Sequence, residues 1–549
     1  MDIVSFPLPS SQPLAEAYCA QSDSRVSALF GRHPSEEGAW QARYAYLQEK
    51  SGQRVPAEQL ARVLLDYNRR FGADEVVSRN IEAIAQGAPV IVGGQQAGLW
   101  TGPLLVIHKA VTIIQAAKHA ESRIGRPVVP VFWIAGEDHD WDEANHAYLQ
   151  GAGEEPRKIA VAHPGGSKTS VSRTLLAEAD LKAAIQELAA VLSDSPNKQQ
   201  LLAMLQAAAD KSETLTDWFS HVLAHLFGEY GLVLLDADDP ALRMLEADMF
   251  RTLIKRGDEL ERAYRHAGEA IRTLGYREQA EAAEGCANLF LYHGETAGGG
   301  QERTLLFRQG DEFVNRRGTV RIAAEELLEV AVQSPERLSN NVLTRPLMQD
   351  HVLPVLAAVL GQGEIAYWAQ TSEAFRLLGM EMPIIVPRMS FTLVEPQLPK
   401  QMEKYGLSFG DVIERYPAKR QAWLDEREEW AIGEKFDQTR AQFEQLYTPL
   451  VELLSTLESG LSRLGDVNRE RILREIAYLE RRAKDAHARR FDAALRQMDR
   501  VAQSLWPSGK PQERVLNAMQ FYNQYGTDWV KQLLDVPFAT DGGHRLVYL

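Results

Sequence analysis

The chain has 549 residues and a formal net charge of −15, from 60 Lys and Arg residues against 75 Asp and Glu residues. Its content of 45% apolar and 25% charged residues is typical of a folded globular protein of several domains and excludes a disordered or low-complexity chain. The acidic balance argues against nucleic acid as the main ligand, because binding the phosphate backbone needs a basic surface.

Neither a membrane span nor a secretory signal is expected. The longest apolar stretches, at 127–135 and 352–360, hold about nine residues, whereas a helix needs about 20 to cross a bilayer. The N-terminal residues lack the basic and apolar segments of a signal peptide. Cys19 and Cys286 are the only cysteines in the sequence, too few for a cysteine-rich zinc site or a disulfide framework. We therefore expect a soluble, cytoplasmic protein.

Five short runs predict the strands of a parallel sheet, because most are apolar and suit strands covered on both faces. The predicted strands are Pro89–Gly93, Val128–Ile134, Gly231–Asp236, Glu364–Trp368 and Pro383–Pro387. A helix over about 346–360 is expected before the fourth strand. Because the runs alternate with helical segments, they predict an α/β fold with a doubly wound parallel sheet. Two intervals are too long for simple crossovers and are predicted to be insertions; the second contains a hairpin at 304–308 and 312–316.

From about residue 430 the apolar residues follow the three- and four-residue spacing of helices. One run includes Phe443 and Leu450, another includes Ile472 and Leu479, and Gly465-Asp466 lies between them. This pattern predicts two long helices that form an antiparallel coiled-coil hairpin. Pro449 should kink the first helix or mark its start. Two amphipathic helices packed on the core are the alternative.

These patterns predict eight parts along the chain. They are an N-terminal helical segment of the core (1–85), the first part of the core (86–150), an insertion (151–225), a core strand (226–245), a second insertion (246–340), the last part of the core (341–396), a helical coiled-coil domain (397–510) and a C-terminal segment that returns to the core (511–549).

The first candidate site is the glycine-rich turn after the first strand. It leads into a predicted helix at 104–119, whose free N–H groups could bind an anion. Thr101 could cap this helix or bind a phosphate or carboxylate, and His108 lies about two turns further on, where it could face the same side. The alternative is an ordinary turn with His108 in the core. The candidate residues are Gly94, Gln95, Gln96, Thr101, Gly102 and His108.

The second candidate site is the acidic segment after the second strand. Six of the seven residues at 137–143 are titratable and repel one another unless a cation, an amine or arginines offset them. His139 could act as a general base that Asp138 or Asp140 orients, while carboxylates such as Glu137 could bind an ammonium group or Mg²⁺. A solvated acidic loop is the alternative. Zinc is disfavoured, because no sulfur ligand is nearby in sequence.

A third group follows the fifth strand. Arg388, Ser390 and Thr392 could bind a phosphate or carboxylate, or form a plain βα loop. Less specific polar candidates are Arg345, Gln349 and Asp350, which begin a later helix, and Gln362, Glu364, Tyr367 and Gln370, which flank the fourth strand.

Three segments carry a resemblance to a known family: VGGQQAGLWTGPLLVIHK (92–109), PVVPVFWIAGEDHDWDEANH (127–146) and PRMSFTLVEP (387–396). Together they resemble the bacillithiol biosynthesis cysteine-adding enzyme family, over essentially the whole chain. The resemblance implies a ligase that forms an amide bond between cysteine and glucosaminyl-malate, the last step in making the low-molecular-weight thiol bacillithiol. It also implies a Rossmann-like core, connecting-peptide insertions and a coiled coil used for dimerisation. The expected partners are therefore the two small substrates and a second copy of the chain, without nucleic acid or membrane.

The core is also similar to class I aminoacyl-tRNA synthetases. Gly102–His108 resembles their G-P-L-H-I-G-H segment and keeps the last His, but Leu105 and Ile107 replace the first His and the second Gly. Arg388–Thr392 resembles their K-M-S-K-S loop, with Phe391 at the second Lys. These replacements remove groups on which ATP chemistry relies.

Amide formation needs an activated carboxyl group, so ATP or another phosphate donor is expected on chemical grounds. The degenerate motifs leave that cofactor unknown, and no metal is assigned. Two other functions stay open: a metal-dependent hydrolase that uses the acidic segment, and a dimeric ligand-binding protein without catalysis.

Overall fold

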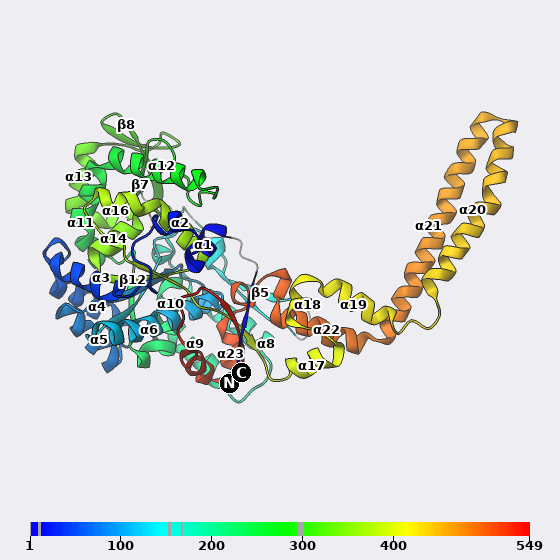
Figure 1. The fold of residues 1–549 in the computed structure, drawn as a ribbon, viewed down its shortest axis with the longest axis horizontal. Helices are drawn as coiled ribbons and strands as arrows, with labels where there is room; N and C mark the ends of the chain where they lie inside the picture. The colour runs from blue at the N-terminus through cyan, green and yellow to red at the C-terminus, as the bar shows by residue number, and fades with distance from the viewer. Residues whose placement is uncertain (1, 9–11, 152–154, 166–167, 295–300) are drawn as a thin grey trace. The chain divides into compact units, whose positions relative to one another are not determined.

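The computed structural model describes residues 2–8, 12–151, 155–165, 168–294 and 301–549 (Figure 1). The chain forms two compact units. The first contains the described residues of 1–151, 156–394 and 511–549, and the second contains Glu155 and 395–510. Within the described ranges, no helix combines the length and the apolar character needed to cross a membrane.

A five-stranded parallel sheet forms the centre of the first unit. Its strands lie in the order β13-β12-β2-β3-β6. They are β2 (Val90–Gln95), β3 (Val129–Ile134), β6 (Val233–Asp236), β12 (Val355–Leu360) and β13 (Ile384–Pro387). The chain adds strands outward from β2 in one direction and then, starting with β12, in the other. The predicted doubly wound parallel sheet is therefore confirmed, and its order reverses between β2 and β12.

Alternate residues of the strands enter two separate cores, one on each face of the sheet. Val90 and Val92 join one core, whereas Ile91 joins the other. Helix α6 (Leu105–Ile124) packs on the face that contains Ile91 and is buried almost all round. Gly93 permits this packing, because a Cβ atom there would lie 2.8 Å from Cδ1 of Ile113 on α6. The sheet is thus buried on both faces, as its apolar strands require.

The fourth strand and the helices next to it differ from the prediction. The apolar run Val355–Leu360 is strand β12, and the predicted strand at 364–368 lies in helix α15 (Gln362–Trp368). The preceding helix, α14, ends at Val352. A short apolar run does not distinguish strand from helix by periodicity. Pro354, which cannot continue a helix, separates α14 from β12.

Three smaller sheets complete the first unit. A three-stranded sheet joins both ends of the chain to the segment after β13, in the order β1 (Ile3–Phe6), β15 (His544–Tyr548), β14 (Ser390–Val394). The interval between β3 and β6 contains a hairpin of β4 (His146–Leu149) and β5 (Arg157–Ala160). The interval between β6 and β12 contains an antiparallel sheet of β7 (Cys286–His293), β8 (Glu302–Gln309), β9 (Glu312–Asn315), β10 (Arg321–Ala323) and β11 (Leu338–Asn340). The predicted hairpin is confirmed as β8 and β9.

The remaining α-helices of the first unit are α1 (Pro13–Ala20), α2 (Ser24–Ser27), α3 (Ala39–Glu49), α4 (Ala57–Arg70), α5 (Glu75–Ala85), α7 (Trp141–Ala144), α8 (Glu178–Val191), α9 (Lys198–Ala209), α10 (Leu215–Phe227), α11 (Pro240–Lys255), α12 (Gly257–Thr273), α13 (Ala324–Gln333), α14 (Arg345–Val352), α16 (Ser372–Leu377), α23 (Ala518–Tyr525) and α24 (Asp528–Leu534). Two short 3₁₀ turns matter for the site: η2 (Leu99–Thr101) and η8 (Gln512–Arg514).

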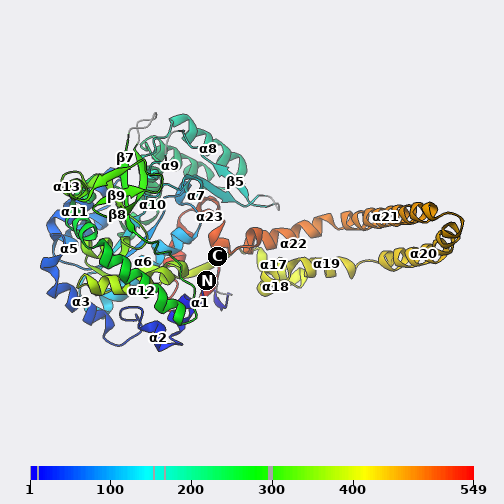
Figure 2. The ribbon, with the colours of Figure 1, turned by 90° about the horizontal axis from the view of Figure 1, so that it is seen from above.

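The second unit is helical. It contains α17 (Leu398–Tyr405), α18 (Phe409–Glu414), α19 (Tyr416–Asp425), α20 (Ile432–Leu457), α21 (Ser459–Arg490) and α22 (Asp492–Leu505). Helices α20 and α21 run side by side in both views and form the predicted antiparallel hairpin (Figures 1 and 2).

One detail of this hairpin corrects the prediction: the turn lies at Glu458, not at Gly465-Asp466. Pro449 lies inside α20, so of the two alternatives for this proline the helix start is excluded. Gly465 has a packing role within α21, because a Cβ atom there would lie 3.1 Å from Val451 of α20. The glycine therefore allows the two helices to pack closely. In sequence, a glycine of this kind cannot be told from one that ends a helix.

Candidate active site

A cavity of about 420 Å³ lies where the sheet order reverses. The ends of β2 and β12 contribute Gly94 and Gly361 to its wall. In doubly wound sheets, the crevice at the carboxyl ends of the strands at this reversal is the usual place for a ligand. The polar and charged side chains of the wall are Gln95, Gln96, Lys109, Asp138, Gln279, Arg345, Gln349, Gln362, Glu364, Tyr367, Arg388 and Arg514.

Lys109 ties the two glycine-containing strand ends together. Its Nζ donates to the carbonyl oxygen of Gly94 at 2.5 Å and to Oε2 of Glu364 at 2.6 Å. The same Glu364 oxygen accepts the backbone N–H of Gly361 at 2.7 Å. The Lys109 side chain is only 1% exposed, and burial lowers its pKa although Glu364 opposes that effect. This ion pair therefore fixes the shape of the cavity wall.

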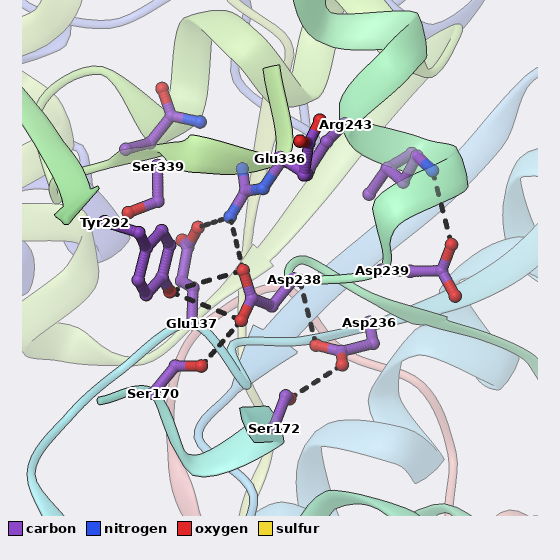
Figure 3. A network of polar contacts seen from close by, with 12 residues as sticks. Glu137, Ser170, Ser172, Asp236, Asp238, Asp239, Arg243, Tyr292, Glu336 and Ser339 are labelled. Carbon is purple, nitrogen blue, oxygen red and sulfur yellow. Dashed lines mark hydrogen bonds and ion pairs between the residues drawn. The ribbon is translucent and has the colours of Figure 1, made fainter. Parts of the chain in front are cut away.

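Arg345 lines the cavity, and a residue outside the cavity holds its side chain in place. Its Nε donates to Oε1 of Glu137 at 3.2 Å. The second oxygen of Glu137 accepts from Arg243, and the glutamate is 1% exposed (Figure 3). Glu137, which we predicted to bind substrate, is thus enclosed between two arginines and does not line the cavity. It orients Arg345 instead.

A buried charge network lies around Arg243 (Figure 3). Asp238 accepts from Ser170 at 2.6 Å and from the phenol of Tyr292 at 3.2 Å. Burial and the neighbouring Asp238 raise the pKa of Asp236 to about 7. Burial raises the pKa of Glu246, which pairs with Arg243, to about 7 as well. The network links β6 to strand β7 and holds two carboxyl groups that titrate near neutrality.

Asp138 brings negative charge into the cavity wall. Its side chain accepts from Nε2 of Gln96, from the backbone N–H of His139 at 2.7 Å and from that of Asp140 at 3.2 Å. Burial alone would raise its pKa, but Gln96 and the charges of Arg303 and Arg345 outweigh burial and lower it. The structure thus brings Gly94, Gln95, Gln96 and Asp138 together in one cavity, although they follow two different strands.

His139 and Asp140 lie next to this wall without lining the cavity. Nδ1 of His139 is 3.0 Å from Nη1 of Arg303 and 3.9 Å from Oδ1 of Asp138. A guanidinium can only donate, so Nδ1 accepts and the neutral ring carries its hydrogen on Nε2. Burial and Arg303 lower the pKa of His139, which keeps the ring neutral at pH 7. Asp140 caps α7 by accepting the N–H of Glu143.

His108 also lies outside the cavity. Its side chain is fully buried, donates from Nδ1 to Oε2 of Glu513 at 2.7 Å and meets the ring of Phe391 edge-on. Arg388, which does line the cavity, binds the same carboxylate through Nη1 at 2.8 Å and Nη2 at 2.6 Å. His108 therefore reaches the cavity only through Glu513 and Arg388.

Thr101 and Gly102 are buried in the turn that precedes α6 and do not line the cavity. Helix α6 begins at Leu105 without a side-chain cap, so the predicted capping role of Thr101 is wrong. The residues before the helix take left-handed conformations, with φ values of 50° at Trp100 and 81° at Thr101. Asn517 stabilises the turn by donating to the carbonyl oxygen of Gly102 at 2.7 Å.

Ser390 and Thr392 share one imidazole. Their hydroxyls lie 2.8 Å from Nδ1 and 2.9 Å from Nε2 of His544, which faces them from β15. Burial lowers the pKa of His544 to about 4. Thr392 is fully buried, whereas Ser390 lines a second cavity of about 520 Å³ that shares Arg388 with the first.

Several residues of the site carried little or no signal in the sequence. Lys109 ends the first predicted motif, but the sequence assigns it no role, and Arg345 and Glu364 are only unspecific candidates. Arg303 comes from an insertion, and Glu513 from the C-terminal segment, more than 120 residues from Arg388. Only the fold brings such residues together.

Two features of the structure bear on metal and nucleotide binding. Among the side chains that the structure describes, no three His, Cys, Asp or Glu residues come together as a possible metal site. His108 and Phe391 occupy signature positions of the two synthetase-like motifs, and their buried rings pack on each other. These residues do not fit a nucleoside triphosphate held as in class I synthetases.

Comparisons with known proteins agree with this architecture. Residues 1–389 match the family model described as "Bacillithiol biosynthesis BshC, N-terminal Rossmann-like domain", and residues 391–549 match "Bacillithiol biosynthesis BshC, C-terminal coiled-coil domain". Proteins named "Putative cysteine ligase BshC" from Geobacillus kaustophilus and Geobacillus thermodenitrificans are 39% and 38% identical, each over 100% of both chains. A solved structure named as a putative arginyl-tRNA synthetase from Campylobacter jejuni aligns with a TM-score of 0.23 and 8% identity, over 81% of this chain and 99% of that one, a likeness too low to support any argument.

Proposed function

The chain belongs to the BshC family of bacillithiol biosynthesis, and on this basis we propose that it is a ligase that adds cysteine to glucosaminyl-malate. The reaction joins the cysteine carboxyl group to the glucosamine nitrogen as an amide. It would complete bacillithiol in the cytoplasm.

The observation that carries this proposal is the charge arrangement of the cavity at the sheet reversal. Arg345 and Arg388 supply positive charge from two sides, and Asp138 supplies negative charge between the ends of β2 and β3. A sugar that carries an amine and a malate group needs both signs within one site. We propose that the arginines bind malate carboxylates and that Asp138 attracts the ammonium group.

The reacting nitrogen must lose protons before it attacks. We propose His139 as the base, because its lowered pKa keeps the ring neutral at pH 7. The basic lone pair is on Nδ1, which Arg303 occupies at 3.0 Å, so this contact has to open before proton transfer. The new C–N bond then forms as the bond between the cysteine carbonyl and its leaving group breaks, and that group departs with the electron pair.

A free carboxylate does not acylate an amine at a useful rate, so cysteine must react in an activated form. The residues at the synthetase-like positions do not support ATP binding there, because His108 and Phe391 pack together away from the cavity. The proposed roles therefore concern binding, orientation and proton removal by the chain's own residues.

Reconstitution with purified components tests the function. The protein, cysteine, glucosaminyl-malate and a panel of phosphate donors are combined, and the amide product is measured by mass spectrometry. Product with the wild type is expected, at a rate at least about ten-fold above that of Arg345→Gln because the variant loses one charged contact to the substrate. Absence of product with every donor, together with normal bacillithiol levels in a deletion strain, would contradict the proposal.

We further propose that the second unit forms a homodimer through its hairpin. Four leucines of α20 recur at the spacing of a coiled-coil stripe, yet each is 53–75% exposed; they are Leu446, Leu450, Leu453 and Leu457. Such a stripe in water favours a covering partner. Sedimentation of the full chain should give a dimer, and a chain without 430–506 should sediment as a monomer; a dimer after this deletion would contradict the hairpin as the sole interface.

A further inference from the structure

One carboxylate connects three separate parts of the first unit. Glu513 in η8 accepts from Nη1 and Nη2 of Arg388 at 2.8 and 2.6 Å and from Nδ1 of His108 at 2.7 Å. The glutamate is 3% exposed. Its four lone-pair sites thus serve a bidentate arginine and an imidazole, which leaves little capacity for a ligand.

Burial and the contacts among Glu513, Arg388 and His108 determine which of these side chains are charged. Burial alone would raise the pKa of Glu513, but Arg388 and His108 outweigh burial and hold it well below its ordinary value. Burial would lower the pKa of Arg388, but Glu513 outweighs that effect and raises it. Burial lowers the pKa of His108, so the ring is neutral and Nδ1 carries the donated hydrogen. The ion pair therefore persists across the physiological pH range.

The position of Glu513 is itself fixed. The preceding residue, Gln512, donates to the carbonyl oxygen of Leu393 in β14 at 3.0 Å and accepts the N–H of the same residue at 2.8 Å. The following residue, Arg514, lines the cavity. The turn η8 is thus bound to a strand on one side and borders the site on the other.

Arg388 keeps two N–H donors that this arrangement does not use, the one on Nε and the second one on Nη2. Nη1 and Nη2 bind Glu513, and Nη1 also reaches the carbonyl oxygen of Met389 at 3.1 Å. Within the described part of the chain, no acceptor takes the hydrogen on Nε. A Cβ atom on Gly361, at the cavity end of β12, would lie 4.0 Å from this Nε. Nε therefore lies next to a residue that lines this cavity, and Gly361 and Arg388 also line the second cavity.

We infer that Glu513 is a positioning residue, which holds Arg388 so that Nε and the positive charge are directed at a carboxylate of the anionic substrate in the cavity. This inference rests on the proposed function for the identity of that substrate. His108 acts in the same chain of contacts, because it supports Glu513 without reaching the cavity.

Glu513→Gln tests the inference, because it keeps the size of the side chain and removes its charge. We expect the KM for glucosaminyl-malate to rise about ten-fold or more, with kcat and the KM for cysteine changed less than about three-fold. The dissociation constant of malate, measured by calorimetry, should rise by a similar factor. Glu513→Asp should recover part of both losses, because it restores the charge at a shorter reach.

Asp350→Asn is the matched control. Asp350 is a fully buried carboxylate that pairs with Arg43 at 2.5 Å and Arg54 at 3.1 Å and does not line the cavity. A purely structural role for Glu513 predicts the same kinetic changes in both variants, and unchanged malate binding in folded Glu513→Gln would likewise overturn the inference. If Glu513→Gln does not fold, Glu513→Asp carries the test, and malate binding within two-fold of the wild type overturns it.

The two proposals fail in different ways. Intact malate binding without product formation would contradict the ligase function. The positioning role would then be decided by malate binding to the Glu513 variants alone. A wild-type protein that does not bind malate would overturn the positioning role, even if product forms.

Discussion

The ion pair between Lys109 and Glu364 offers a quantitative test of how the cavity is built. Lys109 is 1% exposed and its carboxylate partner 27% exposed, so Glu364→Gln leaves a buried ammonium group without a counter-charge. Removing one partner of a buried pair costs about 3–5 kcal/mol. Because the Lys109 Nζ keeps two neutral acceptors, Gly94 O and Gln95 Oε1 at 3.2 Å, we expect a loss of about 2–4 kcal/mol in unfolding free energy at pH 7.

The sign of the pH dependence follows from the pKa of the lysine. Burial already lowers the pKa of Lys109 below its ordinary 10.5, and Glu364 is the group that opposes this shift. Replacing Glu364 with Gln therefore lowers the pKa of Lys109 further. A base whose folded-state pKa is depressed destabilises the fold at low pH and is relieved as pH rises toward the unfolded value. The loss in Glu364→Gln should therefore be smaller at pH 9.5 than at pH 7.

Urea unfolding of the two single variants and of Lys109→Met/Glu364→Gln at both pH values measures these effects. The double variant should be more stable than the sum of the single losses predicts, because neither charge is then unpaired. The exposed pair of Lys182 and Glu178 on α8 is a matched control, in which the same cycle should give coupling within experimental error. Strict additivity at Lys109 and Glu364, or equal losses at both pH values, would refute the reasoning.

Three other variants test separate features. Arg303→Gln should raise the pKa of His139, because Arg303 now lowers it, and should move the acid limb of the kcat/KM profile to higher pH; an unchanged limb would contradict His139 as the base. Asp236→Asn should reduce the fall in stability between pH 5 and pH 8 by about 2–3 kcal/mol, because a carboxyl group whose folded pKa is raised to about 7 loses stability as pH rises through that window; an unchanged pH dependence in thermal melts would count against it. Leu446→Glu/Leu453→Glu should dissociate the proposed dimer in sedimentation runs without loss of helix content, whereas a persistent dimer would place the interface elsewhere.

The central sheet could be predicted because its signals are local. The run at β2 is apolar, β-branched and followed by glycines, and such a pattern suits a buried parallel strand ending at a ligand site. The run at Val355–Leu360 is equally apolar but contains two alanines, and it was assigned to a helix. Its true state is set by pairing with β2 and β13, which lie far away in sequence.

Local sequence signals predict some residues of the candidate site and miss others. The glycine-rich turn and Asp138 were predicted, because both follow strands and carry chemistry in consecutive residues. Sequence spacing could not show that Glu137 would be enclosed by Arg243, 106 residues away, or that His139 would meet Arg303 across 164 residues. Contacts of this kind decide whether a polar residue binds a ligand or positions a neighbour, and only the folded chain reveals them.

The central claim is that the cavity at the reversal between β2 and β12 binds glucosaminyl-malate. A crystal structure of the protein soaked with glucosaminyl-malate and cysteine tests it most directly. We expect the malate carboxylates at Arg345 and Arg388 and the glucosamine nitrogen near Asp138. Clear density for the sugar at another place, with this cavity holding only solvent, would contradict the account.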